Sequence, residues 1–101
     1  MSEQSVLIVD DEPDIRELLD ITLSRMGLRT HCAANLGEAK GLVSELLPDL
    51  CLTDMRLPDG NGISLVEYIQ QNHSNIPVAM ITAHGSVETA IAALKAGAFD
   101  F

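Results

Sequence analysis

The chain has few basic residues. Six lysines and arginines stand against 15 aspartates and glutamates, which gives a net charge of −9 over 101 residues. Binding to a nucleic-acid backbone needs a basic surface, so nucleic acid is not an expected partner. The chain also lacks any apolar run long enough to span a membrane, and residues 1–4 lack the basic flank and apolar core of a signal peptide. We therefore expect a cytoplasmic protein with no membrane partner.

Apolar runs alternate with segments of helical periodicity along the whole chain. Strand-like runs occupy residues 6–9, 29–33, 50–53 and 78–81, and residues 99–101 begin another. Helical spacing follows Pro13 as far as Gly27, follows Asn35 as far as Pro48, and recurs over residues 65–69 and 87–94. Residues 55–62 contain Pro58, Gly60 and Gly62, which predicts a loop, and the Pro58-Asp59-Gly60 segment is interpreted as only a turn.

This alternation predicts one α/β domain over residues 1–101. Strands that alternate with helices form a parallel sheet with right-handed crossovers. We expect a doubly wound sheet of the flavodoxin-like order 2-1-3-4-5, with the polar strand 29–33 at an edge. The first helix should lie on one face of the sheet, and the second, third and fourth on the other.

The two cysteines, Cys32 and Cys51, fall in strands that flank the first strand on opposite sides in this order. A disulfide cannot reach across an intervening strand. We expect two small buried thiols in a reducing compartment.

Three of the apolar runs end in reactive side chains: Asp10 and Asp11, then Asp54, then Thr82. Parallel strands bring their carboxyl ends to one edge, so these residues should share a pocket. Two unit charges about 4 Å apart repel by roughly 4 kcal/mol at an effective dielectric near 20, so the carboxylates must either protonate or bind a cation. Hard oxygen ligands in a partly open site favour Mg²⁺.

A carboxylate beside Mg²⁺ can attack a phosphoryl group and form an acyl phosphate. Asp54 is the central carboxylate, which makes it the best candidate nucleophile, and Thr82 could then donate to a phosphoryl oxygen. His84 follows two residues later. It either overhangs the site and tunes the access of water, or it is a solvated loop histidine.

The motifs that carry these residues resemble the receiver domain of bacterial two-component response regulators. They read VLIVDDEPDIRELL, LCLTDMRLPDGNG, VAMITAHG and KAGAFDF, and together they run along essentially the whole chain. The resemblance implies that Asp54 accepts a phosphoryl group from a sensor histidine kinase. It further implies that Asp10, Asp11, Asp54 and the backbone carbonyl of Arg56 hold Mg²⁺. Two switch positions are also implied, the hydroxyl of Thr82 and the aromatic ring of Phe101.

Within that family, the sequence is most similar to the receivers of σ54-dependent activators of the type IV pilus and nitrogen type. Such a receiver switches output domains that this sequence does not contain. The family also has a lysine just past the aromatic position, whereas this sequence ends at Phe101. We interpret it as a receiver truncated before the last strand and helix. An uncovered sheet face should then lower its stability or favour self-association, and a homodimer is a candidate assembly.

Two other functions remain open. A hydrolase similar to the haloacid dehalogenases would also use an Asp nucleophile with Mg²⁺, but it places a second Asp two residues later, where this chain has Arg56. A phosphorylation-independent interaction module is favoured only by the missing lysine. The receiver interpretation predicts no enzyme beyond catalysis of its own phosphorylation and dephosphorylation.

Overall fold

The computed structural model describes residues 4–81. Its elements are β1 (Ser5–Val9), α1 (Pro13–Arg25), β2 (Arg29–Ala33), α2 (Leu36–Leu46), β3 (Leu50–Thr53), β4 (Arg56–Leu57), β5 (Gly60–Asn61), α3 (Gly62–Asn72) and β6 (Val78–Met80). The first four strands and three helices predicted from the sequence are confirmed, with bounds that agree within a few residues. The predicted helix over residues 87–94 and the strand start at 99–101 lie outside the described residues.

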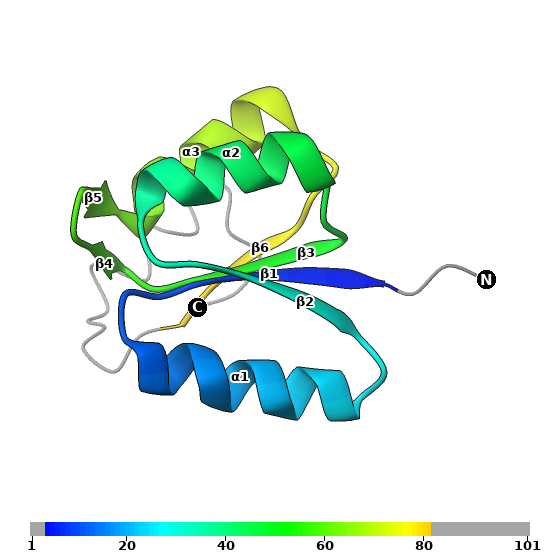
Figure 1. Ribbon diagram of the computed structural model, residues 1–101. Coiled ribbons are helices and arrows are strands. Elements are labelled where there is room, and N and C mark those ends of the chain that lie inside the picture. Colours follow the sequence, from blue (N-terminus) through cyan, green and yellow to red (C-terminus); the bar gives the residue numbers. More distant parts are fainter. Residues whose placement is uncertain (1–3, 82–101) are drawn as a thin grey trace.

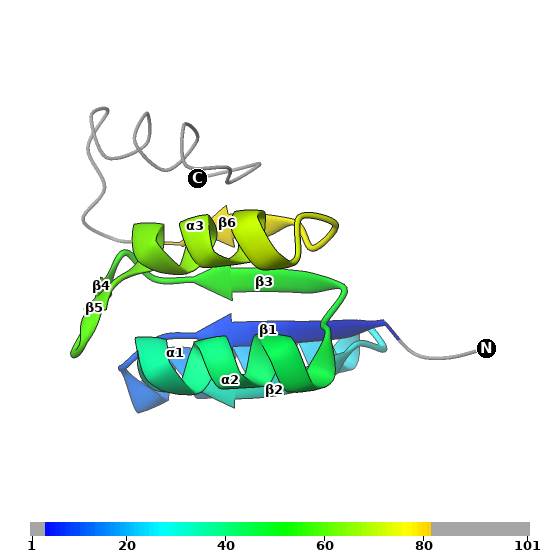
Figure 2. The same ribbon diagram turned by 90° about the horizontal axis from the view of Figure 1, so that it is seen from above.

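The main sheet is parallel and has the order β2-β1-β3-β6. Because β6 is the fourth strand of the alternating pattern, this confirms the predicted order as far as the structure describes it, with β2 at an edge. Figure 1 shows α1 on one face of the sheet and α2 and α3 on the other, as right-handed crossovers require. Seen from above in Figure 2, α2 lies over β1 and β2, and α3 lies over β3 and β6.

The helix ends follow from local sequence. Pro13 is the first residue of α1, and Gly27 adopts a positive φ of 85° just past its end. The N–H groups of Gly27 and Leu28 donate to the carbonyls of Ser24 and Leu23, which forms a Schellman motif. The helix therefore ends where the helical spacing in the sequence stops, at Gly27. At α2, the side chain of Asn35 accepts from the Glu38 N–H at 2.8 Å, and the Ala34 N–H donates to the Glu38 side chain at 3.0 Å.

The two faces of the sheet are covered unequally. On the α2/α3 face, apolar side chains of β1, β3 and β6 pack with those of the two helices into one buried core: Leu7, Val9, Cys51, Val78, Met80, Ala39, Val43, Leu65, Val66 and Ile69. On the opposite face α1 contains no buried residue, and Leu50 and Leu52 are only half-buried. Within residues 4–81, no helix is both long and apolar enough to cross a bilayer.

The prediction that residues 55–62 form only a loop is wrong. Residues Arg56–Leu57 and Gly60–Asn61 pair as a short antiparallel hairpin, β4–β5, with Pro58 and Asp59 at its tip. Two-residue strands are too short to show periodicity. Proline suits the first central position of a tight turn, and Leu57 is buried at 8% exposure, so one side of the hairpin packs on the core.

The expectation of two buried thiols is wrong for Cys32. Both cysteines are free, as predicted, but only Cys51 is buried. Cys32 lies on β2, which is an edge strand of the sheet that residues 4–81 form. Burial raises the pKa of the Cys51 thiol to about 12.

Candidate metal centre

Strand register places the acidic residues side by side. Val9 of β1 pairs with Thr53 of β3, so the next residue on each strand is an aspartate. The Asp10 N–H donates to the carbonyl of Ala33 at 3.1 Å, and the Asp54 N–H donates to the carbonyl of Val9 at 2.8 Å. Backbone hydrogen bonds thus hold both residues at the carboxyl-terminal edge of the sheet.

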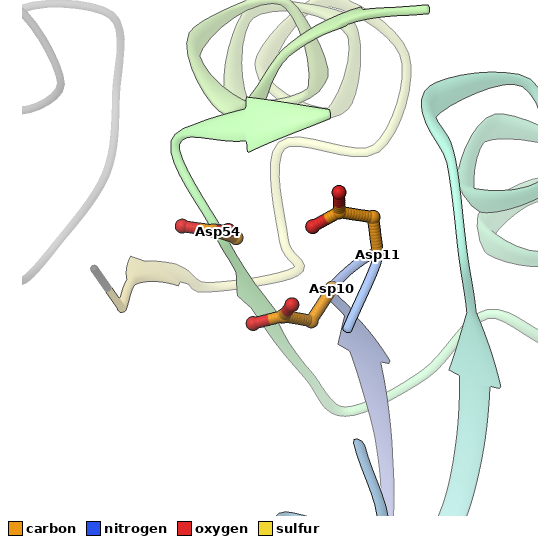
Figure 3. Close-up of side chains that lie close together, drawn as sticks. All are labelled: Asp10, Asp11 and Asp54. Atoms are coloured by element: carbon orange, nitrogen blue, oxygen red, sulfur yellow. The ribbon is translucent and has the colours of Figure 1, made fainter. Parts of the chain in front are cut away.

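Three carboxylates converge at this edge. One carboxylate oxygen from each of Asp10, Asp11 and Asp54 lies within 4.8 Å of the other two. Figure 3 shows Asp10 and Asp11 at the end of β1 and Asp54 at the end of β3. Asp10 is buried at 5% exposure, Asp54 is half-buried and Asp11 is exposed. A set of oxygen donors that is buried on one side and open on the other fits a hydrated Mg²⁺ ion.

The electrostatics of the cluster favour a cation. Burial raises the pKa of Asp10, and the charges of Asp54 and Asp11 raise it further, against a hydrogen bond from the Glu12 N–H at 2.9 Å. Burial also raises the pKa of Asp54, against a hydrogen bond from the Met55 N–H at 2.7 Å. Both carboxylates are therefore held in an environment that opposes their charge.

The cluster is supported by two residues, Arg16 and Gly62, that the sequence analysis did not single out. The guanidinium of Arg16 donates to the backbone carbonyl of Asp10 at 2.8 Å, and its charge lowers the pKa of that carboxyl. Gly62 packs directly on the backbone carbonyl of Asp54, so that a Cβ atom there would overlap it. The sequence offered one signal for each residue. Arg16 is the only basic residue in the first turns of α1, and Gly62 directly follows Asn61, which caps α3.

The remaining predicted site residues are less defined. Arg56 lies on β4, two residues past Asp54. The role of its backbone carbonyl as a metal ligand stays a prediction. Thr82, His84 and Phe101 lie outside the described residues. Their roles as switch and tuning positions stay predictions as well.

Comparison with known proteins identifies the family. The family model of the response regulator receiver domain matches residues 6–101. The chain belongs to this family.

Among curated proteins, the response regulator protein PilR of Pseudomonas aeruginosa is 68% identical over all 101 residues, which cover 23% of that protein. Among solved structures, the beryllofluoride-activated NtrC4 receiver domain dimer is 38% identical with a TM-score of 0.90, over 96% of this chain and 80% of that one. A response regulator from Burkholderia pseudomallei with a phosphorylated aspartic acid and a calcium ion is 26% identical with a TM-score of 0.91, over 97% of this chain and 58% of that one.

These relatives confirm the resemblance to receivers of σ54-type activators, which extends to the proteins named AtoC and NtrC. The chain spans less than a quarter of the length of the curated relatives named here.

Proposed function

We propose that the chain is a phosphorylation-controlled receiver in which Asp54 accepts a phosphoryl group from a histidine kinase. The observation that carries this proposal is the convergence of Asp10, Asp11 and Asp54 within 4.8 Å at the carboxyl ends of two adjacent strands. The structural likeness to a response regulator from B. pseudomallei that holds a phosphorylated aspartic acid and a calcium ion supports it.

In the proposed transfer, a carboxylate oxygen of Asp54 attacks the phosphorus of a phosphohistidine on the kinase. A new P–O bond forms as the P–N bond breaks, and the imidazole leaves with the electron pair and takes a proton from water. Hydrolysis returns inorganic phosphate and the free carboxylate. The chain therefore catalyses only its own phosphorylation and dephosphorylation.

Asp10, Asp11, Asp54 and the Arg56 carbonyl form the proposed Mg²⁺ site, in which the ion would supply positive charge to offset the carboxylates and the phosphoryl oxygens. Asp11 is the exposed member of the pair at the end of β1 and is free to contact the ion directly. Asp10 has one oxygen engaged by the Glu12 N–H and acts through water. Thr82 is the proposed donor to the phosphoryl group.

Beyond the site, we propose that phosphorylation switches a transcription-activating output domain, since PilR and its relatives are several times longer than this chain. Dimerisation is a further proposal, supported by the NtrC4 receiver, which forms a dimer in its activated form. The proposed compartment is the cytoplasm, where a sensor kinase presents its phosphohistidine.

The test is labelling with acetyl phosphate, followed by intact-mass spectrometry. The protein should gain one phosphoryl group with Mg²⁺ and none with a chelator. Steady turnover of a phosphatase substrate at the same site would instead indicate a hydrolase. Absence of label in the presence of Mg²⁺ would favour an interaction module that works without phosphorylation.

A further inference from the structure

The tip of the β4–β5 hairpin is fastened to a distant helix. The carboxylate of Asp59 accepts two backbone hydrogen bonds from the first residues of α2: Leu36 N–H to Oδ1 at 2.7 Å and Gly37 N–H to Oδ2 at 2.9 Å. Both donors belong to the first turn of the helix, where backbone N–H groups have no partner within the helix. A carboxylate is the acceptor that the positive end of the helix dipole favours.

A second contact fixes the same tip. A Cβ atom on Gly60 would lie 2.7 Å from Cδ2 of Leu36, so the hairpin backbone packs directly on that side chain. Asp59 and Gly60 therefore hold the tip against α2 from two adjacent positions. A two-stranded hairpin this short has little stability of its own, so these contacts define where it lies.

The base of the hairpin adjoins the candidate metal centre. The Gly62 N–H donates to the Met55 carbonyl at 2.7 Å and closes the base, and Gly62 packs on the Asp54 carbonyl. Arg56, whose carbonyl is a proposed metal ligand, is the first residue of β4. Movement of the tip would therefore displace the backbone on which Asp54 and Arg56 are carried.

We propose that Asp59 is a positioning residue for the phosphoacceptor site. By accepting hydrogen bonds from the N–H groups of Leu36 and Gly37, its carboxylate holds the hairpin in a fixed position. That position aligns the Arg56 carbonyl and Asp54 for a divalent cation. The inference rests on the proposed function of that site and assigns to Asp59 a role beyond that of a turn residue.

The matched control is Asn35. Its side chain caps the same helix end by accepting from the Glu38 N–H, and within residues 4–81 it forms no hydrogen bond to the hairpin. Asp59→Ala and Asn35→Ala both remove acceptors from the first turn of α2, whereas only Asp59→Ala releases the hairpin. Asp59→Asn keeps one acceptor oxygen and is the milder variant.

The experiment titrates Mg²⁺ alone by calorimetry and measures hydrogen exchange at the Gly62 amide. Asp59→Ala should weaken Mg²⁺ binding about tenfold and speed exchange at Gly62, with a smaller effect for Asp59→Asn. Asn35→Ala should leave both values as in the unaltered protein, even with an equal loss of thermal stability. Equal effects in the two alanine variants, or no effect of Asp59→Ala, would overturn the proposal.

Labelling by acetyl phosphate separates this inference from the proposed function. If the unaltered protein is labelled while Asp59→Ala binds Mg²⁺ normally, only the role of Asp59 is overturned. If the unaltered protein binds Mg²⁺ but is never labelled, and Asp59→Ala still weakens that binding, the positioning role stands and the phosphoacceptor function falls.

Discussion

The backbone carbonyl of Asp54 occupies the space in which a Cβ atom on Gly62 would lie. Gly62→Ala must therefore displace the backbone beside the proposed phosphoacceptor. We expect a loss of about 2 kcal/mol in the free energy of unfolding and a lower yield of phosphorylated protein. Denaturant titration and intact-mass spectrometry measure the two effects.

Gly41→Ala is the control for that substitution. Gly41 lies within α2, and a Cβ atom there would meet nothing within 4 Å. Alanine should stabilise the helix by about 0.5–1 kcal/mol. Equal stability changes for the two substitutions would contradict the close packing at Asp54.

Asp54→Asn should stabilise the protein in metal-free buffer. The folded pKa of Asp54 is raised above 3.8, its value in the unfolded chain, chiefly by burial. The folded state therefore binds more protons between these two pKa values, and its stability falls as pH rises through them. Removing the charge should gain about 1 kcal/mol at pH 7, a figure already reduced for partial exposure.

The pH and metal dependence checks the cause of that gain. The gain in stability of Asp54→Asn should shrink as the pH falls through the raised pKa of Asp54 towards 3.8. It should disappear when Mg²⁺ is added at pH 7. Glu67→Gln removes one exposed charge on α3 and is the control. Thermal unfolding midpoints that show the same gain for both variants would count against a strained carboxylate cluster.

Asp11→Ala should weaken Mg²⁺ binding more than Asp10→Ala does. Asp11 is the exposed carboxylate of the cluster, whereas Asp10 is 5% exposed and already accepts a backbone hydrogen bond from Glu12. Calorimetric titration of both variants measures the difference. A larger loss in Asp10→Ala would exchange the roles of the two residues.

Leu47→Gly should stabilise the end of α2. Leu47 has a positive φ of 49° and a side chain that is 59% exposed, so glycine relieves backbone strain and little packing is lost. We expect a gain of about 0.5 kcal/mol after the entropy of glycine in the unfolded chain is subtracted. Leu46→Gly, one residue earlier and helical, should lose about 1 kcal/mol instead. A loss of stability in both would show that the strain at Leu47 is small.

Much of the fold could be predicted because the deciding signals are local. The aliphatic run before Asp10 and the cap at Gly27 each define an element without reference to the rest of the chain. The convergence of Asp10 and Asp54 also followed, since parallel strands deliver their ends to one edge.

The sequence could not predict contacts that depend on how a short loop or hairpin packs against a distant segment. The two hydrogen bonds that Asp59 accepts from α2 depend on where the hairpin lies, and an Asp in a Pro-Asp-Gly segment is equally typical of an isolated turn. The packing of Gly62 on Asp54 has the same origin. The exposure of Cys32 depends on which strand is outermost, and edge position decides burial there more than residue type.

The most direct test is to locate the phosphoryl group after reaction with acetyl phosphate and Mg²⁺. Borohydride reduces an acyl phosphate, so the labelled aspartate is marked permanently, and peptide mass spectrometry identifies it. We predict that the mark is found at Asp54 alone and that Asp54→Asn carries none. A mark at Asp10 or Asp11, or a phosphorylated Asp54→Asn protein, would contradict the assignment.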